Sequence, residues 1–101
     1  MKIEQMIGRS GKAVANQFII RESEGISPNN CIEYFQSYKS IIAKRDKFRA
    51  GKEKRQVWLD SIYWNYSRTT SKYRSLFLGE STKETQKKID DGTYTLVNLN
   101  N

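Results

Sequence analysis

The strongest chemical signal in this sequence is a cluster of cations in residues 44–55. Seven of these twelve residues are Lys or Arg, and two are acidic. Flexible or forked cations contact phosphate groups, and a protruding β-hairpin can enter a nucleic-acid groove. Phe48 within the cluster can stack on a base or insert between two. We predict that this segment binds an anionic partner through Lys44, Arg45, Lys47, Phe48, Arg49, Lys52, Lys54 and Arg55.

The same residues fit a second interpretation. Charge keeps many exposed loops soluble, and Phe48 can fold back on the sheet instead of contacting a partner. Like charges packed this closely repel one another unless a counter-surface is present. Both interpretations therefore stay open from the sequence.

Arg68, Lys72 and Arg74 form a second basic group, which we add to the predicted binding surface. Arg68 and Lys72 are four residues apart, so they share a face if a helix begins early enough. The hydroxyl and backbone N–H groups at residues 69–71 can hold an anion at a helix N-terminus. Ordinary helix capping explains the same hydroxyl groups and is the favoured interpretation.

Three aromatic residues, Tyr63, Trp64 and Tyr66, precede this basic group. Such residues can form a platform on which bases stack. More often they belong to a hydrophobic core, and we expect Trp58 and Trp64 to anchor it. An exposed Tyr66 would favour the stacking interpretation.

The sequence offers little for catalysis. It contains no histidine and one cysteine, Cys31, which excludes a Cys/His zinc site, a Ser-His-Asp triad and a Cys-His dyad. Residues 8–13 resemble a phosphate-binding loop only faintly, because Ala13 stands where that loop has Ser or Thr. The acidic residues show no paired-carboxylate spacing. We predict a protein that is not an enzyme, with no catalytic residue, metal site, cofactor or small-molecule substrate.

The net charge of +7 is concentrated in the middle of the chain. Eleven of the 18 Lys and Arg residues lie between Lys39 and Arg74, where only three acidic residues occur. Such an uneven distribution of charge suggests a negatively charged partner, which is a nucleic acid, a nucleoprotein or an acidic protein surface. No apolar run approaches the ~20 residues that a membrane-spanning helix needs, so we expect no membrane association.

Alternating apolar residues and turn signals predict strands at residues 3–7, 14–22, 32–38, 41–45, 56–59 and 93–99. A short helix should end at Gly79, and a capping box at residues 81–84 should begin a second helix that ends near Asp91. The expected fold class is α+β, an antiparallel β-sheet of five to six strands with two short helices near the C-terminus. We expect residues 1–101 to form a single domain.

Several segments resemble a family of small domains of unknown function encoded by bacteriophages and mobile elements. The resemblance covers most of the chain, and it is carried by residues 7–18, 34–44, 57–60, 63–74, 77–80, 82–85 and 94–96. It implies an α+β fold and a phage source, but it supplies no catalytic residues.

A phage source in turn implies an accessory protein that blocks a host defence by binding. From this resemblance we expect a non-enzymatic, anti-CRISPR-like inhibitor of a nucleic-acid-targeting effector, located in the cytoplasm of the infected bacterial host. The basic charge excludes mimicry of DNA. The alternative is an accessory protein that binds DNA or RNA directly. A third hypothesis is a homodimer formed through exposed strand edges.

Overall fold

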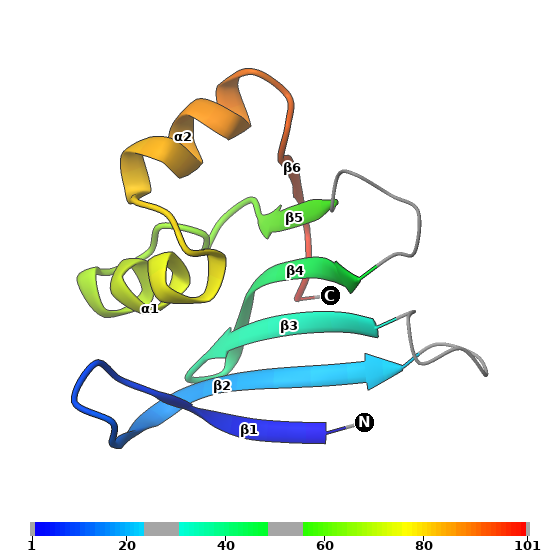
Figure 1. Cartoon of the computed structure of the whole chain (residues 1–101). Coiled ribbons are helices and arrows are strands. Elements are labelled where there is room, and N and C mark those ends of the chain that lie inside the picture. The colour runs from blue at the N-terminus through cyan, green and yellow to red at the C-terminus, as the bar shows by residue number, and fades with distance from the viewer. Residues whose placement is uncertain (1, 24–30, 49–55, 101) are drawn as a thin grey trace.

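The computed structural model describes residues 2–23, 31–48 and 56–100. Six strands form one sheet in the order β1-β2-β3-β4-β5-β6, and two helices are inserted between β5 and β6 (Figure 1). The elements are β1 (Lys2–Ile7), β2 (Ala13–Ser23), β3 (Cys31–Ser37), β4 (Ser40–Phe48), β5 (Val57–Asp60), α1 (Arg68–Leu78), α2 (Thr82–Asp90) and β6 (Thr95–Val97). The expected α+β fold is confirmed.

The expectation of a wholly antiparallel sheet was wrong at one edge. The first five strands are antiparallel, but β6 pairs with β5 in parallel. The two helices together carry the chain back to the end of the sheet where β5 begins, which a tight hairpin cannot do. The last strand is also shorter than predicted: it covers Thr95–Val97 instead of residues 93–99.

Local capping determines where both helices begin and end. The Oγ of Ser67 accepts a hydrogen bond from the backbone N–H of Thr70 at the start of α1. Gly79 ends that helix with a left-handed φ of 73°, which glycine adopts without steric cost. Ser81 and Glu84 form the predicted capping box at the start of α2. The predicted end of α1 at Gly79 and the predicted capping box of α2 are confirmed, whereas the sequence had not singled out Ser67 as the cap of α1.

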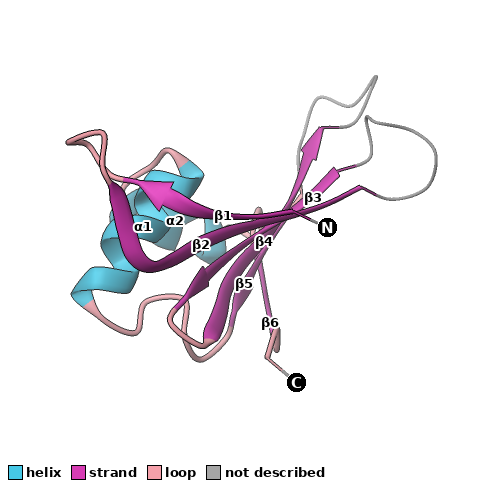
Figure 2. Ribbon diagram, turned by 90° about the horizontal axis from the view of Figure 1, so that it is seen from below, coloured by secondary structure: helices cyan, strands magenta, loops and turns pink. Residues whose placement is uncertain are grey.

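The hydrophobic core lies between the sheet and the helices. The strand register places Phe35, Ala43 and Leu59 on one face of adjacent strands, and all three are fully buried. The ring of Phe77 on α1 stacks against Phe35 with 5.8 Å between centroids. Figure 2 shows the twist of the sheet, with both helices gathered toward the end that carries the β1–β2 turn. The opposite face of the sheet is not covered by either helix.

The end of the sheet next to α1 is held together by contacts between segments distant in sequence. The backbone N–H of Tyr38 donates to the carbonyl oxygen of Asn16 at 2.7 Å, where Asn16 has a positive φ of 64°. Asn tolerates this conformation better than most residues do. The hydroxyl groups of Ser37 and Thr70 are 3.2 Å apart and buried, and they join the end of β3 to the first turn of α1. The start of β2, the β3–β4 turn and α1 are therefore joined at one end of the sheet, and the β1–β2 turn lies at the same end (Figure 1).

Candidate functional site

Lys44 and Arg45, the first residues of the predicted basic segment, point to opposite faces of β4, as consecutive residues of a strand must. The Nζ of Lys44 lies 4.9 Å from the centroid of the Trp58 ring, on the face not covered by the helices. Arg45 lies on the helix side, where its Nε donates to Glu33 at 2.9 Å and its guanidinium lies 4.0 Å from the centroid of Phe77. These two cations do not form one surface.

The rest of the predicted basic segment is mostly outside the described residues. The backbone of Lys47 and Phe48 belongs to β4, which is longer than predicted, but nothing is described of either side chain. Arg49, Lys52, Lys54 and Arg55 lie outside the described part of the chain. Their role as binding residues stays a prediction.

The second basic group is divided between the outside and the inside of the protein. Arg68 and Lys72 are exposed, whereas Arg74 is fully buried, with 0% of its surface accessible. Successive residues turn by about 100° around a helix, so Lys72 lies close to Arg68 and Arg74 lies on the far side. The guanidinium of Arg74 is therefore not part of the exposed surface, whereas Arg68 and Lys72 are accessible to a partner.

A groove of about 530 Å³ lies beside these two exposed cations. It is lined by residues 65–68, by Ser71, Lys72 and Ser75 of α1, and by Thr82 at the start of α2. The ring of Tyr66 at this groove is 70% exposed and contacts the edge of Tyr63, with 5.4 Å between centroids. The core interpretation holds for Tyr63 and Trp64, which are partly buried, but Tyr66 points to solvent.

Arg74 binds the groups that form the floor of this groove. Its Nη1 donates to the Trp64 carbonyl at 2.7 Å and to Asn65 Oδ1 at 3.2 Å. Its Nη2 donates to Thr82 Oγ1 at 2.6 Å and to Ser75 Oγ at 3.4 Å. All four acceptors are neutral, and Arg74 forms no ion pair with any residue that the structure describes. Burial lowers the pKa of Arg74, and the more distant charge of Glu80 opposes this only in part.

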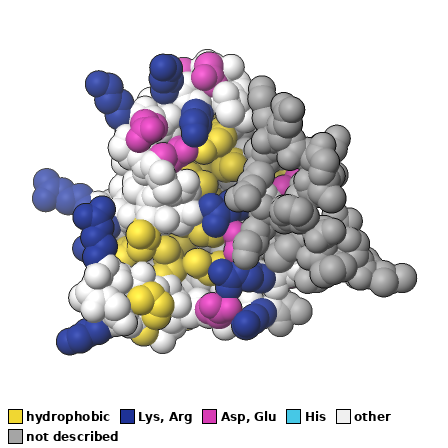
Figure 3. All heavy atoms as spheres, viewed as in Figure 1, with side chains coloured by type: hydrophobic (Ala, Val, Ile, Leu, Met, Phe, Trp, Pro, Cys, Tyr) yellow, Lys and Arg dark blue, Asp and Glu magenta, His cyan; other side chains and the backbone are white. Residues whose placement is uncertain are grey.

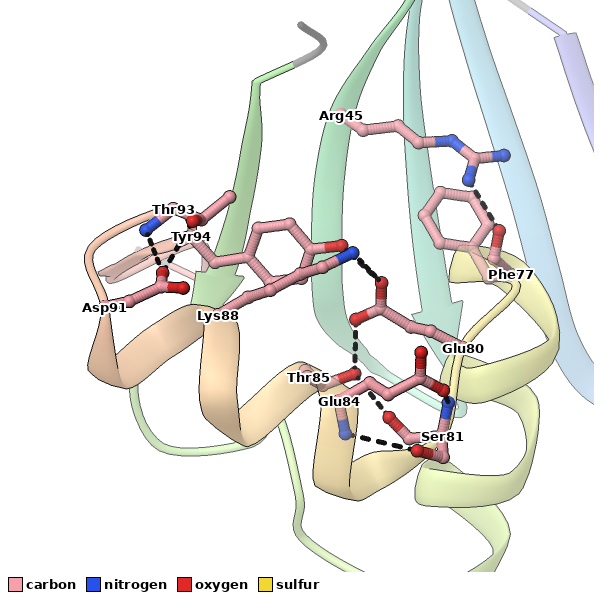
Figure 4. A network of polar contacts seen from close by, with 10 residues as sticks. All are labelled: Arg45, Phe77, Glu80, Ser81, Glu84, Thr85, Lys88, Asp91, Thr93 and Tyr94. Atoms are coloured by element: carbon pink, nitrogen blue, oxygen red, sulfur yellow. Dashed lines mark hydrogen bonds and ion pairs between the residues drawn. The ribbon is translucent and has the colours of Figure 1, made fainter.

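The opposite situation occurs at Glu80, on the other side of the α1–α2 junction (Figure 4). Its Oε1 accepts hydrogen bonds from Lys88 at 2.8 Å and from Tyr94 at 2.6 Å, and its Oε2 accepts one from Thr85 at 2.6 Å. Burial alone would raise the pKa of Glu80, but these hydrogen bonds lower it below its ordinary value. Burial and the Glu80 contact raise the pKa of Tyr94 to about 12. This network fixes α2 to the end of α1 and to the segment before β6.

Three further cations lie at the end of the sheet where the groove is found. Arg9 and Lys12 are exposed in the β1–β2 turn, and Lys39 is exposed in the β3–β4 turn. We call these residues, together with Arg68 and Lys72, the basic end. None of the five forms an ion pair with a residue in the described ranges. In Figure 3 dark blue side chains project at the left over α1 and the β1–β2 turn, without magenta ones among them.

The sequence analysis did not connect Arg9 and Lys12 with Arg68 and Lys72. The sequence did contain a signal for this basic end: residues 7–16, 36–43 and 61–76 contain no Asp or Glu. Only the tertiary contacts show that these three segments meet. Elsewhere the described cations are often paired, as Arg21 and Arg45 are with the buried Glu33.

Other classes of site find less support. In the described ranges no three Cys, Asp or Glu side chains are grouped as metal ligands. No helix there has the length and apolar character that crossing a membrane requires.

The fold and site define a small α+β protein with one basic end and a polar groove beside it. The chain belongs to a family of unknown function (DUF8033), whose model matches residues 1–92. The resemblance to a domain family of unknown function is confirmed at this level. No curated protein and no solved structure matches the chain.

Proposed function

We propose that this chain is a non-enzymatic protein that binds the phosphate backbone of a nucleic acid through the basic end. The observation that carries the proposal is the meeting of three acid-free segments, each with exposed and unpaired cations, at one end of the sheet. The β1–β2 turn presents Arg9 and Lys12, the β3–β4 turn presents Lys39, and α1 presents Arg68 and Lys72. A surface of this kind suits an extended polyanion better than a single buried ligand.

The charge balance of the remaining surface supports the same proposal. Lys2 pairs with Glu4 at 3.3 Å, and Lys88 pairs with Glu80 at 2.8 Å. In Figure 3 dark blue and magenta side chains occur together over α2, unlike at the basic end. A nucleic acid would therefore be attracted to one end of the protein rather than to its whole surface.

A salt series tests this proposal directly. Fluorescence anisotropy with labelled duplex DNA, single-stranded DNA and single-stranded RNA should give affinities that fall steeply as salt rises. Five phosphate contacts correspond to a slope of about −4 in a plot of log K against log salt. The double variant Arg68→Gln with Lys72→Gln should reduce this slope by roughly 1.5 to 2.

A matched control removes the same charge elsewhere. Lys2 lies at the opposite end of β1, and Lys87 lies on the exposed side of α2. Lys2→Gln with Lys87→Gln should leave the slope nearly unchanged. Equal losses in the two double variants would mean that net charge alone attracts the nucleic acid, and the proposal would be wrong.

The narrower hypothesis is inhibition of a host nucleic-acid-targeting defence effector by a phage-encoded protein. It is supported by the sequence resemblance to phage-encoded domains and by the same basic end, which could contact the nucleic acid of a nucleoprotein. It predicts binding to the assembled effector but not to naked nucleic acid. Pull-down from infected host lysate, with and without nuclease treatment, separates it from direct binding.

A further inference from the structure

The groove beside the basic end has several hydrogen-bond donors that are not used within the described part of the chain. Arg74 can only donate, so Asn65 must turn its oxygen toward it, and the Asn65 amide nitrogen has no partner among the described residues. Ser75 and Thr82 likewise accept from Arg74, and in the described part of the chain no group accepts their own hydroxyl hydrogens. Three neutral groups of the groove therefore keep hydrogens to donate.

Charge makes the same groove suitable for an anion. Arg68 and Lys72 line it and are exposed, and neither is paired with an acid in the described part of the chain. The guanidinium of Arg74 lies beneath it with neutral partners only. The Nε of Arg74 is buried and has no hydrogen-bond partner in the structure. The more distant charge of Glu80 offsets the burial of Arg74 only in part, so this buried cation still attracts negative charge to the groove.

The lining of the groove indicates what can bind there. The groove is shallow and open, with a volume of about 530 Å³ that is within the range of small-ligand sites. Tyr66 offers an exposed ring at the groove, and a ring of this kind stacks on a nucleic-acid base. Donors and cations beside one aromatic ring together match a single nucleotide.

The number of cations distinguishes a terminal from an internal phosphate. An internal phosphodiester carries one negative charge, whereas a phosphate monoester carries about −1.5 to −2 near neutral pH. Two exposed cations above a third that is buried favour the more highly charged group. The geometry points to a binding site for the phosphate monoester at the end of a nucleic-acid strand, with the terminal base stacked on Tyr66. This inference rests on the proposed binding of nucleic acid by the basic end.

The experiment compares short single-stranded oligonucleotides that differ only in the terminal group. One strand has a 5′-phosphate, one has a 3′-phosphate and one has two hydroxyl ends; each carries an internal label, and the full chain is titrated into it while the anisotropy is measured. We expect one of the phosphorylated strands to bind about tenfold more tightly than the hydroxyl strand. Adenosine monophosphate and inorganic phosphate are added as competitors to each.

Two sets of variants separate this inference from the proposed function. Arg68→Gln with Lys72→Gln should reduce the preference for the phosphorylated strand about tenfold, while Tyr66→Ala should weaken phosphorylated and hydroxyl strands alike and Tyr66→Phe should retain the affinity. Arg9→Gln with Lys12→Gln and Lys39→Gln should weaken all strands alike and leave the preference unchanged. Tyr66, Arg9, Lys12 and Lys39 are all exposed, so thermal unfolding should show that each variant remains folded.

Each outcome decides between the two statements. Equal affinity for phosphorylated and hydroxyl strands would overturn the terminal-phosphate site but leave the proposed function standing. Failure of every strand to bind would overturn the proposed function itself. Binding of adenosine monophosphate that depends on Tyr66, without any preference among strands, would assign the groove to free nucleotides and overturn the strand-end site.

Discussion

Arg74 and Glu80 are buried charges on the two sides of the α1–α2 junction, and the protein treats them differently. Glu80 receives hydrogen bonds from a lysine, a tyrosine and a threonine, and one of these partners carries the opposite charge. Arg74 has only neutral acceptors among the described residues. The carboxylate of Glu80 is thus paired directly within the protein, while the charge of Arg74 is opposed only by the more distant Glu80.

The pairing of a buried charge therefore distinguishes a structural network from a candidate binding site. A buried charge costs several kcal/mol unless it is paired, so an unmatched charge is retained at the expense of stability. The Glu80 network joins the α1–α2 linker, α2 and the segment before β6, which is a structural role. The cation at Arg74 is surrounded by groups that line a groove, and an incoming anion can supply the missing charge. Four predictions follow from this contrast, in order of decreasing effect.

The largest effect on stability should come from removing the carboxylate of Glu80. Glu80→Ala leaves the buried hydroxyl of Tyr94 without its acceptor and Lys88 without its counter-charge, so the free energy of unfolding should fall by about 3 kcal/mol. Urea denaturation followed by circular dichroism measures this. The control Asp90→Ala, on the exposed side of α2, should change it by no more than about 0.5 kcal/mol.

Arg74→Met should cost less, about 1 kcal/mol in the same denaturation experiment. Methionine fills a similar volume and removes a desolvated charge, which offsets part of the loss of hydrogen bonds to the Trp64 carbonyl and the groove residues. The same variant should abolish the preference for phosphorylated strands. A destabilisation equal to that of Glu80→Ala would show that the Arg74 charge is matched in the native fold, and the contrast would fail.

Tyr94→Phe isolates one hydrogen bond of the Glu80 network and should lower the free energy of unfolding by about 1 kcal/mol. Ultraviolet titration of the parent protein should show one tyrosine that ionises near pH 12, and this signal should be missing in Tyr94→Phe. If all tyrosines of the parent ionise together near pH 10, the described burial of Tyr94 is incorrect.

The smallest effect should appear at acidic pH. The pKa of Glu80 is lowered in the folded state, so its contribution to stability is present above the unfolded value of about 4.5 and is lost as the pH falls through the folded pKa. The free energy of unfolding should therefore decrease less between pH 7 and pH 3 for Glu80→Gln than for the parent protein. Parallel curves would indicate that Glu80 has an ordinary pKa in the fold.

Local physics made a large part of the fold predictable. Gly79 ends α1, the capping box of Ser81 and Glu84 begins α2, and the glycines of residues 8–11 allow the β1–β2 turn. Each of these signals involves residues within a few positions of one another. The parallel pairing of β6 was not predictable in this way, because it depends on where two packed helices deliver the chain.

The candidate site shows the same limit more sharply. Arg68, Lys72 and Arg74 look alike in the sequence, but the packing of α1 against β3 and β4 decides which of them faces solvent. Tyr66 and Trp64 are separated by one residue, yet one ring is exposed and the other contributes to the core.

The sequence by itself determined the basic charge, the acid-free segments, the end of α1 and both ends of α2, because composition and capping need no distant partner. Only the tertiary structure decided that the two turns and α1 meet at one end, and that Arg74 lies beneath a groove instead of on the surface. The physical reason is that burial depends on contacts between segments far apart along the chain, and such contacts exist only once the sheet and helices have packed.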